Sequence, residues 1–270
     1  MAIFQSARGH LHYEELGSGR PILLLHGFTN YGLGWAPQLA ALVHSGHRVI
    51  VPDLHGHGAS APATALTTVP DLASDIAALL DHLTVGPVTV CGLSLGGMVA
   101  MEMALARRDR LAGLIVANST ASFSGSERTA AVAGWIALLR QENGPVKRLE
   151  ATWQTLVNED FRESAAGRAC HDAWATVLRR VSGMSLCHVA KGMTQFDVRG
   201  RLATITVPTL VIGGERDLLF GVDGGRAIAR EIPNSEFTVI PGAGHISSLD
   251  SADRFNHLVL AFLADCVPPT

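Results

Sequence analysis

The chain has little net charge, few cysteines and no long uninterrupted run of apolar residues. Its 21 Lys and Arg nearly balance its 24 Asp and Glu, for a formal net charge of -3, so the composition gives no sign of nucleic-acid binding. No apolar run is long enough to cross a bilayer. Residues 1–15 include His10, Glu14 and Glu15, which interrupt the apolar core that a signal peptide needs. We therefore expect neither a nucleic-acid partner nor membrane association.

The cysteines are also too few to suggest a disulfide-stabilised protein. The chain has four, Cys91, Cys170, Cys187 and Cys266. A chain of 270 residues can bury a sufficient core without disulfides. We expect all four cysteines to be reduced and the protein to be cytoplasmic. The sequence does not decide whether the chain forms homo-oligomers.

Short apolar runs alternate with helical stretches along most of the chain. This alternation is typical of a mostly parallel sheet covered by helices, an α/β fold. The expected strands are residues 21–25, 47–51, 87–91, 111–117, 209–212 and 236–240.

Residues 121–202 differ from the rest of the chain and predict an inserted helical lid. They lack a comparable β-branched run and carry 11 Lys and Arg against 8 Asp and Glu, whereas the remainder carries 10 against 16. The predicted core is therefore residues 1–120 and 203–270. The lid holds Trp135, Trp153 and Trp174, which we expect to contact substrate. The alternative is that they only pack the lid against the core.

The clearest chemical signal is the motif Gly92-x-Ser94-x-Gly96, which directly follows the expected strand 87–91 and precedes a helical pattern. In that context it is typical of a nucleophile elbow. The glycines would permit a sharp strand-to-helix turn. The turn would place the Ser94 hydroxyl at a helix N-terminus, which favours an attacking alkoxide. We interpret Ser94 as a nucleophile, with a simple serine N-cap as the alternative.

A serine nucleophile needs a base, and the base needs an acid that orients it. Among 12 histidines we choose His245, because it stands in a glycine-rich loop beyond the last expected strand. Asp217 follows strand 209–212 at its carboxyl end, where α/β sheets place functional groups. Along the sequence the order is nucleophile, acid, base (Ser94, Asp217, His245), which is the order found in proteins that have such an elbow. Glu215 is the competing acid.

Acyl transfer further requires donors for the tetrahedral oxyanion. We expect one from the backbone N–H of Leu95. The other is expected from the N–H of Phe28, in the loop after strand 21–25, with the Phe28 ring beside the acyl pocket. Gly27 would let this loop turn sharply, and the neighbouring His26 is interpreted as structural.

Two further histidines, His55 and His57, are spaced like a pair of metal ligands. No carboxylate or cysteine cluster accompanies them, so the pair is weak support for a metal site. We expect neither a metal nor another cofactor.

The chain resembles the α/β-hydrolase family over nearly its whole length, and within it the 3-oxoadipate enol-lactonase group and related carboxylesterases. The resemblance implies an α/β-hydrolase fold with a helical lid, hydrolysis of an ester or lactone, and a triad and oxyanion hole at the positions given above. The motifs that carry it are His26-Gly27, Asp53-x-x-Gly56-x-Gly58-x-Ser60, Cys91-Gly92-Leu93-Ser94-Leu95-Gly96-Gly97-Met98, Phe196-Asp197-Val198-Arg199, Pro208-Thr209-Leu210-Val211-Ile212 with Asp217, and Gly244-His245-Ile246-Ser247.

These residues predict a serine hydrolase that cleaves a small-molecule carboxylic ester or lactone through an acyl-enzyme. A carbon–carbon bond hydrolase and a cofactor-free perhydrolase would use the same triad, and a hydrolase-like receptor with slow turnover is a third alternative. Carbon–carbon cleavage usually needs an arginine near the nucleophile. We identify none there, since Arg140, Arg179 and Arg180 of the lid could equally face water. Esters and lactones are therefore the predicted substrates.

Overall fold

The computed structural model describes residues 2–266, and the side chains of residues 2–265. Its centre is an eight-stranded sheet in the order β1-β2-β4-β3-β5-β6-β7-β8. Strands β1 and β2 are antiparallel to their neighbours, and all other pairs are parallel. The predicted mostly parallel α/β sheet is therefore confirmed. The strands are β1 Ala2–Ser6, β2 Gly9–Leu16, β3 Arg20–Leu25, β4 His47–Pro52, β5 Val88–Leu93, β6 Leu111–Ala117, β7 Thr209–Gly214 and β8 Ser235–Ile240.

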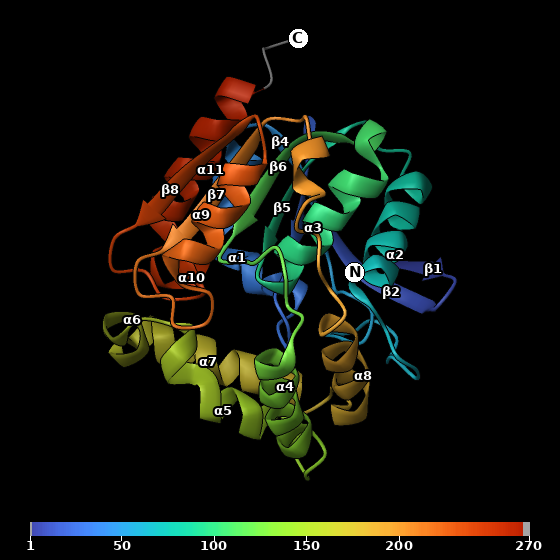
Figure 1. Ribbon diagram of the computed structural model, residues 1–270, viewed down its shortest axis with the longest axis vertical. Coiled ribbons are helices and arrows are strands. Elements are labelled where there is room, and N and C mark those ends of the chain that lie inside the picture. Colours follow the sequence, from blue (N-terminus) through green and yellow to red (C-terminus); the bar gives the residue numbers. More distant parts are fainter. Residues whose placement is uncertain (1, 267–270) are drawn as a thin grey trace.

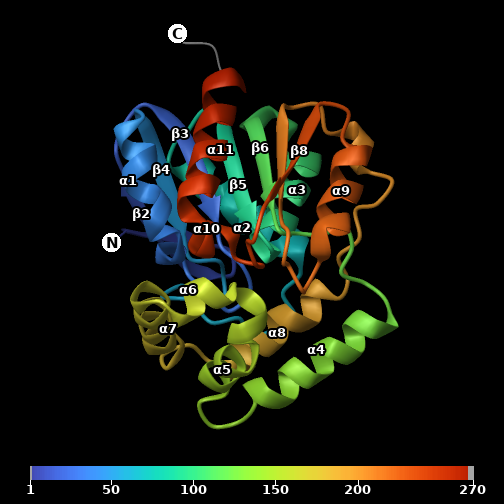
Figure 2. The same cartoon turned by 90° about the vertical axis from the view of Figure 1, so that its left-hand side faces the viewer.

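Helices cover both faces of this sheet (Figures 1 and 2). The parallel strands read as continuous apolar runs because successive side chains alternate between two buried cores. In β3, Leu23 and Leu25 belong to one core, whereas Ile22 and Leu24 belong to the other. The helices on the two faces are α2 Val69–His82, α3 Leu95–Ala106 and α9 Gly221–Glu231 on one, and α1 Ala36–His44, α10 Ser247–Asp250 and α11 Ala252–Cys266 on the other.

Five further helices, called here the inserted helices, lie between β6 and β7 in the sequence. Because β6 and β7 are neighbours in the sheet, the chain leaves the sheet after β6 and returns to the adjacent strand. The inserted helices gather beyond one end of the sheet (Figure 1). They are α4 Ser126–Leu139, α5 Gly144–Leu156, α6 Glu159–Glu163, α7 Ala165–Leu178 and α8 Gly183–Met193.

From the composition we expected reduced cysteines and no membrane-spanning segment. Cys91, Cys170 and Cys187 are free thiols, and the predicted state of Cys266 lies outside the described side chains. Within residues 2–266, no helix combines the length and apolarity that a bilayer span requires.

Candidate active site

Ser94 stands at the sharp turn between β5 and α3. Its φ of 56° and ψ of -116° are strained for a residue with a side chain. A Cβ on Gly92 would lie 2.1 Å from the carbonyl oxygen of Gly96, and one on Gly96 would lie 2.0 Å from that of Leu25. The turn therefore requires glycine at both flanking positions, which is the physical reason for the motif.

His245 and Asp217 form a buried pair at the ends of neighbouring strands. His245 Nδ1 lies 3.0 Å from Asp217 Oδ1 and 3.1 Å from Oδ2, and the two side chains are 3% and 1% exposed. Burial opposes ionisation of the Asp217 carboxyl. The charge and hydrogen bond of His245, together with the Leu219 amide and Asn118, outweigh burial and lower the pKa of this carboxyl to about 2. Asp217 is therefore an ionised acceptor that holds the proton of His245 on Nδ1.

The competing acid, Glu215, is placed differently. Its side chain is exposed and its Oε2 accepts a hydrogen bond of 2.8 Å from the backbone N–H of Gly242. This contact steadies the start of the loop that carries His245. In the structure, Asp217 and not Glu215 contacts the imidazole.

Asn118, directly after β6, supports this pair and was missed by the sequence analysis. Its Nδ2 donates to Asp217 Oδ2 and to the carbonyl oxygen of Gly244, both at 3.2 Å, and its Oδ1 accepts from Ser247 Oγ at 2.6 Å. The residue is buried with a φ of 45°, a conformation that asparagine tolerates better than most residues. A polar residue at the carboxyl end of a buried strand was the available signal.

The predicted oxyanion donors are the amides of Phe28, in the loop after β3, and of Leu95, the residue that follows Ser94. A Cβ on Gly27 would come within 3.3 Å of the Ser94 Cβ, so the loop after β3 passes beside Ser94. Leu95 is the first residue of α3, where backbone N–H groups have no partner within the helix. In the described part of the chain, neither amide donates to another residue. Both are thus available to a ligand.

The histidines near this loop make structural contacts. His26 Nδ1 lies 2.8 Å from the carbonyl oxygen of Gly27, and its Nε2 accepts from the N–H of Leu54 at 3.0 Å, as its structural interpretation requires. His57 is buried with its ring 5.2 Å from that of His26. Burial lowers the pKa of both imidazoles. Among the residues described, no three His, Cys, Asp or Glu side chains gather to hold a metal.

A small cavity of about 50 Å³ connects the catalytic candidates with the inserted helices. Ser94 and His245 line it together with Phe28, Trp135 and Trp174. Trp153 is not a lining residue. Its ring meets that of Trp174 edge-on, with 6.1 Å between the ring centroids, so it packs one inserted helix against another. Of the three tryptophans, two lie where a substrate could touch them.

The prediction that no arginine lies near the nucleophile is wrong. Arg128 of α4 and Arg148 of α5 both line the same cavity as Ser94. The candidates considered from the sequence, Arg140, Arg179 and Arg180, are exposed and do not line it. The error arose because the burial of Arg148 depends on how α5 packs against the core. No local pattern encodes that packing.

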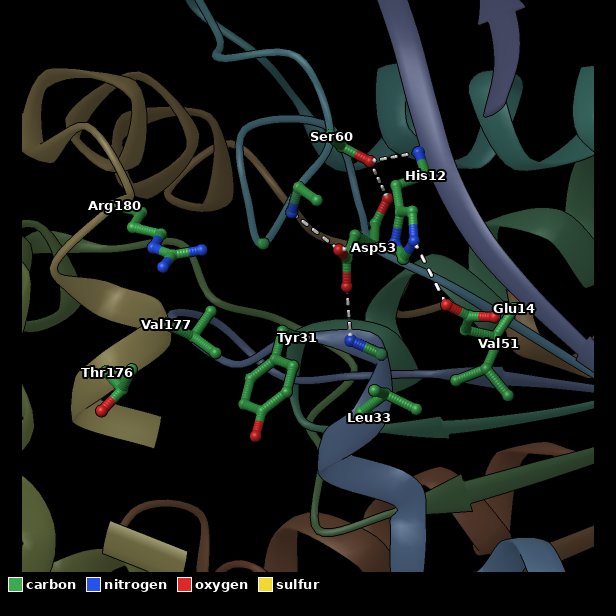
Figure 3. A pocket seen from close by; sticks show the side chains of 13 residues that line it. His12, Glu14, Tyr31, Leu33, Val51, Asp53, Ser60, Thr176, Val177 and Arg180 are labelled. Carbon is green, nitrogen blue, oxygen red and sulfur yellow. Dashed lines mark hydrogen bonds and ion pairs between the residues drawn. The ribbon is translucent and has the colours of Figure 1, made fainter. Parts of the chain in front are cut away.

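A larger pocket of about 520 Å³ lies elsewhere and contains none of the predicted catalytic residues (Figure 3). Its buried carboxylate, Asp53, already accepts from the backbone N–H groups of Gly32 and Ala59 at 2.6 and 2.7 Å, and lies 3.1 Å from His12 Nδ1. Arg180, on its far side, extends from the end of α7 (Figure 3). Asp53 thus anchors the surrounding loops. The small cavity, which Ser94, His245 and Phe28 line together, is the better candidate for catalysis.

Comparisons with known proteins agree with the fold. A model of the family described as alpha/beta hydrolase fold matches residues 20–252. The 3-oxoadipate enol-lactonase 2 of Acinetobacter baylyi is 30% identical over 94% of this chain and 92% of its own length. A thermophilic esterase from Thermogutta terrifontis is 31% identical, with a TM-score of 0.90 over 98% of both chains. The enol-lactonase from Burkholderia xenovorans LB400 is 26% identical, with a TM-score of 0.91 over 98% of this chain and all of its own (100%).

Proposed function

Because the chain belongs to the alpha/beta hydrolase fold family, we propose that it is a serine hydrolase that cleaves a small carboxylic ester or lactone. The observation that carries the proposal is the 3.0 Å contact between His245 Nδ1 and Asp217, in a cavity that His245 shares with the strained Ser94. The similar proteins described as esterase and enol-lactonase support the ester or lactone substrate.

In the proposed mechanism, Asp217 fixes the imidazole tautomer so that Nε2 of His245 takes the proton of Ser94. Ser94 Oγ attacks the carbonyl carbon, and the N–H groups of Phe28 and Leu95 stabilise the oxyanion. His245 then protonates the leaving alkoxide, and an acyl-enzyme forms. Water, deprotonated by the same imidazole, attacks the ester carbon and releases the acid and free Ser94. This mechanism needs no cofactor.

We also propose that residues 121–202 act as a lid over this site. Trp135, Arg148 and Trp174 come from α4, α5 and α7 and line the cavity beside Ser94. A cavity of about 50 Å³ is far smaller than the roughly 300 Å³ of a typical ligand pocket. The acyl part of the substrate is therefore short, or the inserted helices move apart to admit it.

A panel of p-nitrophenyl esters of increasing acyl length, with unsubstituted γ- and δ-lactones, tests the proposal. Turnover of acetate and propionate esters at about 1 per second or faster is expected, with a steep loss beyond butyrate. Near-stoichiometric release that stops after one turnover would instead favour a receptor.

A carbon–carbon bond hydrolase is the second candidate, and Arg148 is the observation that favours it, since that chemistry needs a cation to hold an anionic substrate near the nucleophile. Vinylogous 1,5-diketones belong in the same panel. We expect little or no cleavage of them. Efficient cleavage with only traces of ester and lactone hydrolysis would reverse the order of the two candidates without affecting the triad.

The tryptophans provide a prediction about acyl-chain selection. Trp135→Leu and Trp174→Leu should each change the ratio of kcat/KM between acetate and hexanoate esters by about tenfold. Removing one aromatic ring from the wall of the pocket should change the difference in transition-state binding between the two esters by about 1–2 kcal/mol. Trp153→Leu is the matched control, because the Trp153 ring packs edge-on against that of Trp174 without lining the cavity. It should lower Tm with little change in that ratio. A ratio that shifts most in Trp153→Leu would contradict the proposed lining.

Asn118 provides a prediction about positioning. Asn118→Ala removes the hydrogen bond to Asp217 and should lower kcat/KM by about tenfold, the effect of one charged hydrogen bond. Because alanine is also strained at the φ of 45°, Asn118→Gly is the control that relieves strain without restoring the amide. Asn118→Gly should recover Tm but not activity. Recovery of both would mean that only the backbone conformation matters.

A further inference from the structure

The loop that carries His245 is bound to the inserted helices on both sides of the histidine. On one side, the N–H of Ile246 donates to the carbonyl oxygen of Leu156 at 2.8 Å. On the other, Asn158 Nδ2 donates to the carbonyl oxygen of Gly242 at 3.2 Å. Leu156 ends α5 and Asn158 directly precedes α6. The proposed base therefore lies against the joint between two inserted helices.

Asp250, the last residue of α10, joins the same two segments through one oxygen atom. Its Oδ2 accepts from the N–H of Gly244 at 2.7 Å and from the N–H of Asn158 at 2.9 Å. The segments approach closely here, since a Cβ on Gly244 would lie 2.8 Å from Asp250 Oδ2 and 3.0 Å from the backbone nitrogen of Asn158. Helices α10 and α6 accordingly lie next to each other (Figures 1 and 2). Hydrogen bonds to a carboxylate are stronger than those between neutral groups, so Asp250 is the firmest part of this junction.

Asp250 acts only through the segments that it joins. It does not line the cavity beside Ser94, so it has no contact with a substrate there. Asp217 holds the Nδ1 atom of His245 and thereby sets the tautomer, but the backbone of the loop must be positioned by other contacts. Proton transfer from Ser94 depends on that position, because a displacement of about 1 Å can cost about 100-fold in rate.

We propose that Asp250 is a positioning residue that couples the inserted helices to the base, so that His245 is aligned with Ser94 only while the joint between α5 and α6 rests on its loop. This inference rests on the proposed hydrolase function and gives the lid a part in it. A movement of the inserted helices that admits a substrate would take the joint off the loop, and closure would align the base again. Proton transfer thus follows closure of the lid.

The first test is kinetic. Asp250→Ala should lower kcat on p-nitrophenyl acetate by about 30-fold and leave KM within about twofold, because the base is displaced while the cavity lining is unchanged. Asp250→Asn keeps an oxygen that can accept both N–H groups and should recover most of this loss. Asp253→Ala is the matched control, since it removes an exposed carboxylate of the neighbouring helix α11, and it should change neither constant. Activity in Asp250→Asn as low as in Asp250→Ala, or a loss confined to KM, would overturn the proposal.

The second test changes the junction from the side of the inserted helices. Serine at position 158 keeps an oxygen that can cap α6, as Asn158 Oδ1 does for the N–H of Phe161 at 2.8 Å, but it loses the contact with Gly242. Asn158→Ser should lower kcat by about fivefold, the effect of one hydrogen bond. Because both variants open one junction, the double variant with Asp250→Ala should lose no more than Asp250→Ala alone. Losses that multiply would mean that the two contacts act independently, which contradicts the coupling.

Hydrogen exchange tests the coupling without turnover. The N–H groups of Gly244 and Ile246 both donate across the junction. Both should exchange at least about tenfold faster in Asp250→Ala and in Asn158→Ser than in the wild type. Unchanged exchange at both amides in Asn158→Ser would refute the coupling. If exchange responds in both variants but the wild type cleaves no ester or lactone, the hydrolase function fails and the coupling between lid and loop stands.

Discussion

Ser94→Ala is expected to fold normally and to lose ester hydrolysis by at least about 10⁴-fold in kcat/KM. The hydroxyl is the only group proposed to form the covalent intermediate. The residue's other contacts run through its backbone, which alanine preserves. Its N–H donates to the carbonyl of Ala117 at 3.0 Å, and its own carbonyl accepts from Ser119 Oγ at 2.8 Å.

The measurement combines kinetics with labelling by an active-serine phosphonate. The wild type should be labelled at Ser94 alone, and Ser94→Ala should not be labelled. Ser94→Gly is an informative companion, because glycine adopts the φ of 56° without strain. It should be inactive yet at least as stable as the wild type. A phosphonate found on another serine, or near-normal turnover by Ser94→Ala, would refute the nucleophile assignment.

The position of Ser94 was predictable because local geometry determines it. Glycine is the only residue type that fits at positions 92 and 96 of the turn. A strand before the motif and a helix after it are the context in which this motif forms a nucleophile elbow. His245 and Asp217 followed from the rule that functional groups gather at the carboxyl ends of parallel strands. Each of these inferences uses information contained in a dozen neighbouring residues.

Arg148 and Asn118 were not predictable in that way. Arg148 is buried because α5 packs against Phe28 and Trp135, and an arginine beside exposed Lys147 normally extends its charge to water. The role of Asn118 depends on Asp217 and Gly244, which lie 99 and 126 positions away. Trp135 and Trp174 likewise differ from Trp153 only through packing. The residues that should determine specificity are thus set by tertiary contacts.

Asp217→Asn should lower kcat by about 10⁴-fold, because an asparagine amide in place of the carboxylate favours the wrong imidazole tautomer and cannot stabilise the imidazolium. Glu215→Gln is the matched control. It removes the charge of a carboxylate only two positions away, whose contact is with the Gly242 N–H and not with His245. That variant should stay within about threefold of the wild type, the effect of an exposed polar contact. Steady-state kinetics on p-nitrophenyl acetate separates the two. A loss in Glu215→Gln that exceeds the loss in Asp217→Asn would reassign the acid.

The same pair of variants should differ in how stability depends on pH. The pKa of Asp217 falls from an ordinary value of 3.8 to about 2 in the folded protein, so the unfolded chain takes up a proton at a higher pH than the folded one. The ionised carboxyl therefore stabilises the fold above about pH 4, by on the order of 2 kcal/mol. This contribution disappears as the pH falls toward 2. In urea unfolding, Asp217→Asn should be less stable than the wild type near pH 5, and the two should converge in acid, whereas Glu215→Gln should follow the wild type throughout. A constant difference between wild type and Asp217→Asn across this range would mean that the carboxyl is not held ionised by His245, and the orienting role of Asp217 would have to be abandoned.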